Sequence, residues 1–305
     1  MIIRDQRRRN ILYVLDEKKP RRASIQKDGS IIISKKTASP VDIKKYDRFV
    51  TEKNNGNILT SLKKFTSYLG ASYYSKSSPL WIKALSHILA PGPNIVTGKS
   101  ILDVGCSTGV FLEKLPDRWI KRGVEVNTEA CKIGRKKGLE IQNSTLEEYA
   151  TADKFDIIRA SHVIEHTPNA HKFVKKISTL SKPSALILIY TPNADSFSRK
   201  IFGSDWEGFY DDTHFTIFNN KSLKELFRKY GFSLVSSDSY YMGYMISSVF
   251  RFMGLRDNRF FYKIYPVLYL LFLPTILLHL LSPSFFQGGG LFMVFKRNKK
   301  AEPKE

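Results

Sequence analysis

The chain has 305 residues, and its 49 Lys and Arg against 28 Asp and Glu give a net charge of +21. With 42% hydrophobic and 25% charged residues it cannot be wholly disordered, and its length allows one large domain or two ordinary ones. Its two cysteines are too few for a disulfide framework or a cysteine-rich zinc site. The basic start is followed by too few apolar residues for a signal peptide. We expect a cytoplasmic protein whose basic surface attracts nucleic acid, anionic lipid or phosphorylated substrates.

The first 70 residues form a basic N-terminal region. Residues 23–34 are predicted to form a small hairpin, because Asp28-Gly29 favours a tight turn and a run of isoleucines follows it. Helical patterns follow over 42–69 and over 78–89, the second of which begins with a serine that can cap it and a proline that suits the first turn. The second helix is expected to belong to the domain that comes next.

From residue 100 onward, short apolar runs alternate with amphipathic stretches. This alternation is typical of βαβ units and predicts an α/β fold, a doubly wound and mostly parallel sheet of about seven strands. The predicted strands are 101–104, 123–126, 155–160, 185–190, 232–240 and 291–296, and the predicted helices are 110–115, 128–137, 169–180 and 221–230. Residues 194–219 are predicted to be a long irregular connection, and their aromatic side chains indicate an ordered lid.

An uncharged run, Ile264 to Gln287, lies in a hydrophobic insertion over 250–287, before the last predicted strand. A membrane-spanning helix needs about 20 apolar residues, so the length alone would permit one. Two prolines interrupt the run, and the strand after it has to return to the same sheet, which a single crossing would prevent. A buried helical hairpin or an oligomer interface is one interpretation. We favour an insertion within one leaflet, because flanking Lys and Arg residues would bind anionic headgroups.

A glycine-bearing turn follows the first of these strands, with the sequence Asp103-Val-Gly-Cys-Ser-Thr-Gly109. Glycines there let the backbone approach a ligand closely. The turn also fits the G-x-S-x-G pattern of hydrolases, but that reading leaves Asp103 unexplained and needs a later acid and histidine. Residues 92–100 have the wrong spacing and position for a phosphate-binding loop, and the turn lacks two glycines of the nicotinamide fingerprint.

The turn resembles motif I of the class I S-adenosylmethionine-dependent methyltransferases, and the resemblance runs from Ser77 to Arg297. It implies S-adenosylmethionine as the cofactor and an acid, Glu125, that binds both ribose hydroxyls, as in dinucleotide folds. The family usually has Gly at position 107; Ser107 would weaken binding if the position needs a positive φ. The cofactor contacts that the resemblance implies are Asp103, Gly105, Cys106, Ser107, Gly109, Glu125, Asn143, Ser144, Ser161 and His162.

Histidines are the candidate bases. A sulfonium methyl group is already activated, so the protein mainly positions the acceptor and excludes water, and a hydroxyl acceptor also needs a base within hydrogen-bond reach. We predict His166, after the strand at 155–160, and His214, in the lid, as catalytic residues. Trp206 and Tyr210 of the lid are predicted to contact the substrate. The adjacent carboxylates beside His214 would suit a metal, but such loop carboxylates are usually solvated, and no metal is predicted.

The predicted function is methyl transfer to a hydroxyl of a small or lipid-linked acceptor, a glycan or quinone precursor, by an enzyme peripheral to an anionic membrane. The lid sequence is similar to that of polysaccharide and quinone-biosynthesis methyltransferases. One alternative is an RNA or protein methyltransferase, although no aromatic residues interleave with the N-terminal basic ones, as base stacking would need. The other alternative is a non-catalytic member of the family that binds the cofactor or a membrane. The catalytic domain is predicted to span 71–297, and 298–305 to be a disordered tail.

Overall fold

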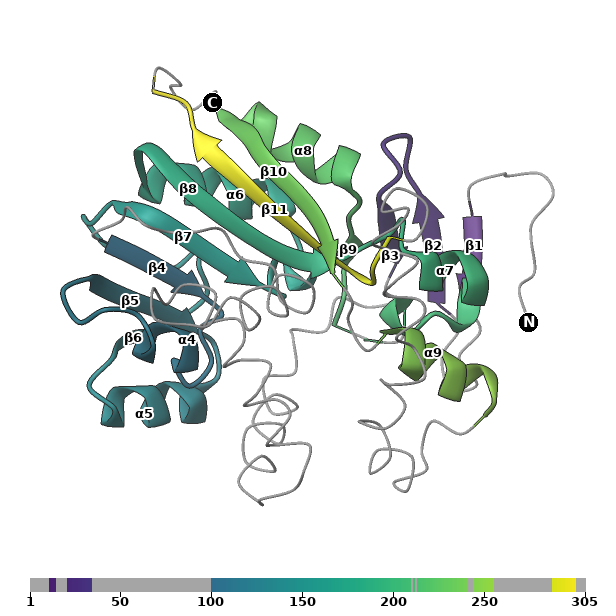
Figure 1. Ribbon diagram of the computed structural model, residues 1–305, viewed down its shortest axis with the longest axis horizontal. Helices are drawn as coiled ribbons and strands as arrows, with labels where there is room; N and C mark the ends of the chain where they lie inside the picture. The colour runs from purple at the N-terminus through teal and green to yellow at the C-terminus, as the bar shows by residue number, and fades with distance from the viewer. Residues whose placement is uncertain are drawn as a thin grey trace, which may run out of the picture.

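The computed structural model describes residues 11–14, 21–34, 100–209, 211, 213–240, 244–254 and 287–299. Its centre is a seven-stranded sheet with the order β10-β11-β8-β7-β4-β5-β6 (Figure 1). The strands are β4 (Ser100–Val104), β5 (Ile120–Glu125), β6 (Glu140–Asn143), β7 (Phe155–Ser161), β8 (Ser181–Pro192), β10 (Phe232–Tyr240) and β11 (Gly290–Arg297). The predicted α/β fold is confirmed. The pattern did not reveal β6, because Ile141 is the one apolar residue in its sequence Glu-Ile-Gln-Asn.

Six of the seven strands run in the same direction, so their carboxyl ends lie along one edge of the sheet. β6, β5, β4, β7 and β8 are parallel, and β11 is antiparallel to both β8 and β10. β10 therefore runs in the same direction as the parallel strands. In open α/β sheets, ligands bind outside the carboxyl ends of the strands. We call this side of the sheet the carboxyl edge.

Helices cover both faces of the central sheet. They are α4 (Val110–Glu113), α5 (Thr128–Lys136), α6 (Ala170–Leu180) and α8 (Asn220–Lys229). Buried side chains of α6 and α8, such as Phe173 and Phe227, pack on one face, and those of α4 and α5, such as Leu112 and Cys131, pack on the other (Figure 1). The side chain of Asn169 caps α6 by accepting a hydrogen bond from the N–H of residue 172.

A second, smaller sheet has the order β1-β2-β3-β9. Its strands are β1 (Ile11–Val14), β2 (Arg21–Ile25), β3 (Ile31–Ser34) and β9 (Thr216–Ile217). The predicted hairpin is confirmed: β2 and β3 pair antiparallel, Asp28 Oδ1 accepts a hydrogen bond from the Ser30 N–H at 2.9 Å, and Gly29 has a φ of 85°. The hairpin is not isolated, because β3 also pairs with β9, which belongs to the lid.

The lid over 194–219 has more regular structure than predicted. It contains α7 (Phe197–Phe202), two 3₁₀ turns, η3 (Gly203–Asp205) and η4 (Glu207–Phe209), and strand β9. Its aromatic residues Trp206 and Phe209 are buried in one core with Ile31 and Ile33 of the hairpin. The prediction of an irregular connection was wrong, because β9 of the lid pairs with β3, a strand that lies far away in the sequence. Figure 1 shows the small sheet with α7 and α9 (Tyr244–Phe252) beyond one end of the central sheet.

Several predictions fall outside the described residues. These are the helices at 42–69 and 78–89, most of the uncharged run, and Tyr210. No helix in the described ranges combines the length and apolar composition that a membrane crossing requires. The tail that the sequence predicts to be disordered begins at Asn298, yet the N–H of this residue donates to the carbonyl of Gly231 at 3.0 Å.

Candidate functional site

The turn after β4 has the backbone that its glycines predict. Gly105 and Gly109 have φ values of 68° and 74°, and Ser107 between them has 51°. The N–H groups of Gly105 and Cys106 both donate to the carbonyl of Val124, at 2.7 and 3.2 Å. Burial raises the pKa of the Cys106 thiol, which therefore stays protonated and fills space in the turn. Position 107 does need a positive φ, which costs a serine roughly 1–3 kcal/mol.

Glu125 ends β5 beside this turn. Its Oε2 accepts a hydrogen bond from the Ser107 N–H and its Oε1 one from the Asn127 N–H, both at 2.8 Å. A carboxylate has about four acceptor sites, so lone pairs remain on both oxygens for two ribose hydroxyls. Asn143 holds the neighbouring strand in place, because its Nδ2 donates to the carbonyls of Glu125 and Val126 at 2.9 and 3.0 Å.

Among the described residues, two buried oxygens at this edge have no hydrogen-bond partner. Asp103 is buried beneath the turn, where Arg159 Nη1 donates to its Oδ1 at 2.7 Å and leaves its Oδ2 without a hydrogen bond. Burial raises the pKa of Asp103, and the Arg159 charge opposes that rise only in part. The hydroxyl of Ser144, next to Asn143, also has no partner within the described part of the chain. Buried polar atoms normally make hydrogen bonds, so these two oxygens, together with the Glu125 carboxylate, are suited to bind a polar ligand such as S-adenosylmethionine.

A buried carboxylate organises the histidines that follow β7. Glu165, in the 3₁₀ turn η2 (Ile164–His166), is 0% exposed. Its Oε1 lies 2.9 Å from His162 Nδ1, and its Oε2 accepts from the Thr191 hydroxyl at 3.0 Å. Burial alone would raise the pKa of Glu165, but the hydrogen bond to His162 and the nearby histidine charges outweigh burial and lower it to about 2. Glu165 is therefore a carboxylate at neutral pH.

Thr213 fixes the ring of His166. The threonine hydroxyl lies 2.7 Å from His166 Nδ1 and donates to Asp211 Oδ1 at 2.5 Å. A hydroxyl has a single hydrogen, so Nδ1 of His166 carries a proton and donates to it. Burial lowers the pKa of His166, and the charge of Glu165 partly offsets this, so the neutral ring is favoured.

His214 lies deeper in the lid. It is 3% exposed, its Nδ1 donates to the carbonyl of Gly208 at 3.0 Å, and its ring centroid is 4.8 Å from that of His166. Glu165, His166 and His214 present ligand atoms within 4.8 Å of one another, a spacing that suits a metal. Glu165 accepts two protein hydrogen bonds, and each of the two histidines makes one through Nδ1, so hydrogen bonds link all three residues to their neighbours. We interpret the cluster as a hydrogen-bonded network and assign no ion to it.

The structure brings most of the predicted residues to the carboxyl edge but not Trp206. This tryptophan is 0% exposed, and its indole N–H donates to Ser198 Oγ at 3.0 Å within the core of the lid. The expected substrate contact does not fit this burial, and we assign Trp206 to packing. The other predicted contact, Tyr210, lies outside the described residues.

Three residues at this edge were not predicted from the sequence to belong to the site: Arg159, Thr213 and Tyr240. Arg159 pairs with Asp103, Thr213 orients His166, and the hydroxyl of Tyr240 lies 2.8 Å from His162 Nε2. The sequence contains a clue to two of them. An arginine in an otherwise apolar strand needs a partner, and the last residue of a predicted parallel strand lies at the carboxyl edge.

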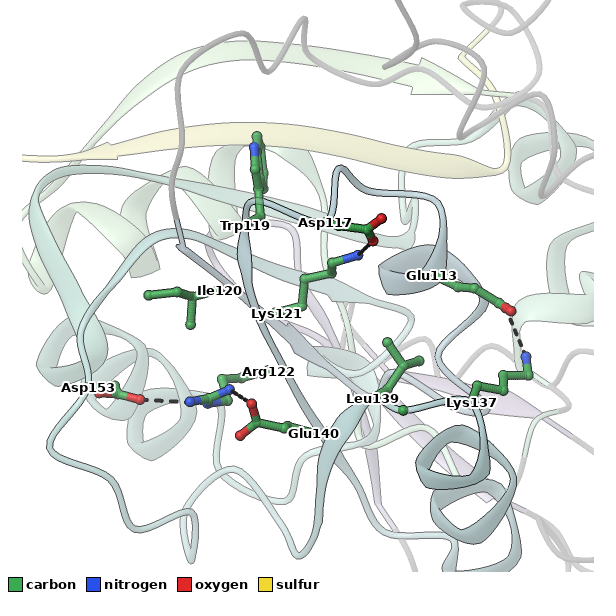
Figure 2. A pocket seen from close by; sticks show the side chains of 11 residues that line it. Glu113, Asp117, Trp119, Ile120, Lys121, Arg122, Lys137, Leu139, Glu140 and Asp153 are labelled. Carbon is green, nitrogen blue, oxygen red and sulfur yellow. Dashed lines mark hydrogen bonds and ion pairs between the residues drawn. The ribbon is translucent and has the colours of Figure 1, made fainter.

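A cavity of about 540 Å³ lies at the opposite edge of the sheet, where β5 and β6 begin (Figure 2). Its charged residues pair among themselves: Arg122 with Glu140 and Asp153, and Lys137 with Glu113. The cavity is remote from the glycine turn, and its charged residues already pair with one another, so we assign it no ligand.

Comparison with known proteins agrees with this site. A methyltransferase domain family model matches residues 74–237, more than half of the chain. The ubiquinone biosynthesis O-methyltransferase of Aeromonas salmonicida is 29% identical over 120 residues, which cover 36% of this chain and 50% of that protein. That of Pasteurella multocida is 32% identical over 127 residues, 36% and 52% of the two chains. The chain thus spans about half the length of the curated relatives it matches.

A solved structure agrees at the level of the fold. The methyltransferase in a Haloferax volcanii complex with the Trm112 methyltransferase activator superposes with a TM-score of 0.52 at 12% identity, over 85% of this chain and 98% of that one. At this identity the likeness shows the fold alone, whereas the family match rests on sequence. The chain therefore belongs to the methyltransferase domain family, the class I S-adenosylmethionine-dependent methyltransferases that the turn from Asp103 to Gly109 predicts.

Proposed function

We propose that the protein transfers the methyl group of S-adenosylmethionine to a hydroxyl oxygen of a small or lipid-linked acceptor. The observation that carries the proposal is the network of Glu165 with His162 and His166 at the carboxyl edge. A hydroxyl has to lose its proton as its oxygen is methylated, and an imidazole beside an ionised carboxylate can take that proton. Because the cofactor supplies an activated methyl group, the protein itself has only to position the acceptor and provide a base.

The acceptor class is proposed to be a quinone or glycan precursor. The curated relatives are named ubiquinone biosynthesis O-methyltransferases, which supports a phenolic hydroxyl. The lid contains His214 and contacts His166 through Thr213, and its strand β9 pairs with the N-terminal hairpin. These contacts support a proposal in which both segments shape the acceptor site. His166 and His214 keep their predicted catalytic roles as hypotheses, with His214 the more buried of the two.

We also propose that the protein binds an anionic membrane surface. Helix α9 ends at Phe252, which is 70% exposed, and Met253 after it is 60% exposed, shortly before the uncharged run begins. Large apolar side chains that are exposed next to such a run support contact with lipid. Sedimentation with anionic vesicles should remove the protein from solution, and deletion of 262–284 should abolish this; a deletion variant that still sediments would assign binding to the basic N-terminal region.

The acceptor can be found with labelled cofactor. The protein is incubated with methyl-labelled S-adenosylmethionine and fractionated lipid, glycan, RNA and protein extracts, with a Glu125→Ala variant as the control. We expect label in a hydroxyl-bearing lipid or glycan fraction, and only with the unaltered protein. Label in RNA or protein would instead support the alternative methyltransferase. Cofactor binding with label in no fraction would support a non-catalytic member of the family.

A further inference from the structure

Tyr240, the last residue of β10, points its hydroxyl at the histidine network. β10 is antiparallel to β11, which is antiparallel to β8, so Tyr240 lies at the carboxyl edge with the ends of the parallel strands. Its Oη is 2.8 Å from His162 Nε2, and the other nitrogen of this ring, Nδ1, is 2.9 Å from Glu165 Oε1. The three side chains thus form one line of hydrogen bonds from β10 to η2.

The protons in this line can be assigned by elimination. Glu165 is ionised and can only accept, so in the neutral form of the His162 ring Nδ1 carries the proton. Nε2 then bears the lone pair and accepts the hydrogen of the Tyr240 hydroxyl. The tyrosine oxygen gives its only hydrogen to His162, and its lone pairs can accept one from another hydroxyl.

The position of Tyr240 is prepared by three consecutive glycines before and at the start of β11. A Cβ on Gly290 would lie 2.3 Å from Tyr240 Cζ, and one on Gly288 would lie 2.3 Å from the Tyr240 carbonyl oxygen. The ring also packs edge-on against Tyr190, with centroids 6.0 Å apart. Any larger residue at 288 or 290 would displace the tyrosine, so its hydroxyl is held where His162 needs it.

His162 is the member of the line that lies next to the cofactor turn. Its side chain is 29% exposed, whereas that of Glu165 is 0% exposed. The following residue contacts the turn directly, because a Cβ on Gly105 would come within 2.5 Å of Val163 Cγ2. His162 itself has a φ of 56°, a strained value for a non-glycine residue, and such strain is found most often at functional sites.

We propose that Tyr240, His162 and Glu165 form a proton relay for the acceptor hydroxyl, an inference that rests on the proposed O-methyl transfer. As the acceptor oxygen bonds to the methyl carbon, its O–H bond breaks and the proton passes to Tyr240 Oη. The tyrosine hydrogen passes to His162 Nε2, and the electron pair of the broken C–S bond stays on sulfur. In this relay Tyr240 contacts the acceptor, while His162 and Glu165 act through it, with the carboxylate stabilising the imidazolium.

The relay is tested with Tyr240→Phe, which removes one oxygen atom and keeps the ring. Methyl transfer to catechol is measured at saturating cofactor, and binding of S-adenosylhomocysteine by calorimetry. We expect kcat to fall at least about 100-fold, while the Kd of S-adenosylhomocysteine changes less than about twofold. Tyr230→Phe is the matched control, because Tyr230 makes a similar hydrogen bond, 3.1 Å to His171 Nδ1, outside the site. It should keep the kcat of the unaltered protein.

A second measurement needs no acceptor. Nitrogen NMR of the imidazoles should show that His162 is protonated at Nδ1 and accepts a hydrogen bond at Nε2. Tyr240→Phe should remove the hydrogen bond at Nε2, and Tyr230→Phe should leave it in place. Glu165→Gln should change which nitrogen of His162 carries the proton. Unaltered kcat in Tyr240→Phe, or a His162 ring protonated at Nε2, overturns the relay. So does a large loss of kcat in His166→Gln with none in Tyr240→Phe. If the protein binds the cofactor but methylates neither catechol nor a hydroxyl in any extract, the result overturns the proposed function and, with it, the role of the relay.

Discussion

The backbone N–H of Ser107 donates to Glu125 Oε2 at 2.8 Å, which ties the turn after β4 to the end of β5. Ser107 makes this contact at a φ of 51°, which favours glycine. Ser107→Gly should therefore raise the free energy of unfolding by about 0.5–1 kcal/mol, once the greater freedom of glycine in the unfolded chain is subtracted. Urea unfolding measures the change, and calorimetry should show S-adenosylhomocysteine binding at least as tight as before.

Ser184 offers a control for this substitution. It has a φ of 65° within β8, away from the turn. Ser184→Gly should stabilise the protein by a similar amount and leave the Kd unchanged. If Ser107→Gly weakens binding, the serine side chain contacts the cofactor and the strain is not the dominant effect.

Glu125 should account for a large part of the cofactor affinity. Glu125→Gln keeps the size of the side chain but removes the charge, and it places an amide donor where one of the two loop N–H groups donates. Loss of charge-assisted hydrogen bonds costs roughly 1.5–3 kcal/mol, so the Kd of S-adenosylhomocysteine should rise at least about tenfold. Glu129→Gln, in the first turn of α5, should leave the Kd unchanged. Equal affinities of the two variants would remove the assignment of the site.

The ionisation of Glu165 should make the fold sensitive to acid. Its pKa is about 2 in the folded protein against an ordinary 4.5, so the carboxylate stabilises the fold above pH 4.5. This contribution, on the order of 3 kcal/mol, is lost as the pH falls from 4.5 toward 2. Glu165→Gln should lower stability at pH 7 and flatten its dependence on pH between 5 and 2. An unchanged slope in urea titrations across that range would show that Glu165 is not the acid-sensitive group.

The N-terminal hairpin should stabilise the lid. Ile31 is 1% exposed in the core that contains Trp206, while Ile32 next to it is 42% exposed. Ile31→Ala should cost about 2–5 kcal/mol and increase amide hydrogen exchange over residues 206–217, since a buried cavity replaces the side chain. Ile32→Ala, on the other face of the same strand, should change both quantities little. Equal exchange in the two variants would mean that the lid holds its structure without the hairpin.

The outline of the fold and the cofactor end of the site could be predicted because they depend on neighbours in sequence. Apolar runs of strand length and a glycine turn after β4 are local patterns, and Glu125 ends the next strand. The histidines could be named but not ranked. Their roles depend on which atoms Thr213, Glu165 and Tyr240 bring to them, and these residues come from the lid, η2 and β10.

The family, the central sheet and the acid at the end of β5 could be predicted from the amino-acid sequence, since each follows from spacing and side-chain type within a few dozen residues. Three other features could be seen only in the folded chain: the hairpin at 21–34 forms one sheet with β9, Trp206 is buried, and Tyr240 contacts His162. The physical reason is the same in each case. Hydrogen bonds and burial between segments as far apart as residues 31 and 217 depend on how the chain closes on itself, and no local pattern records that.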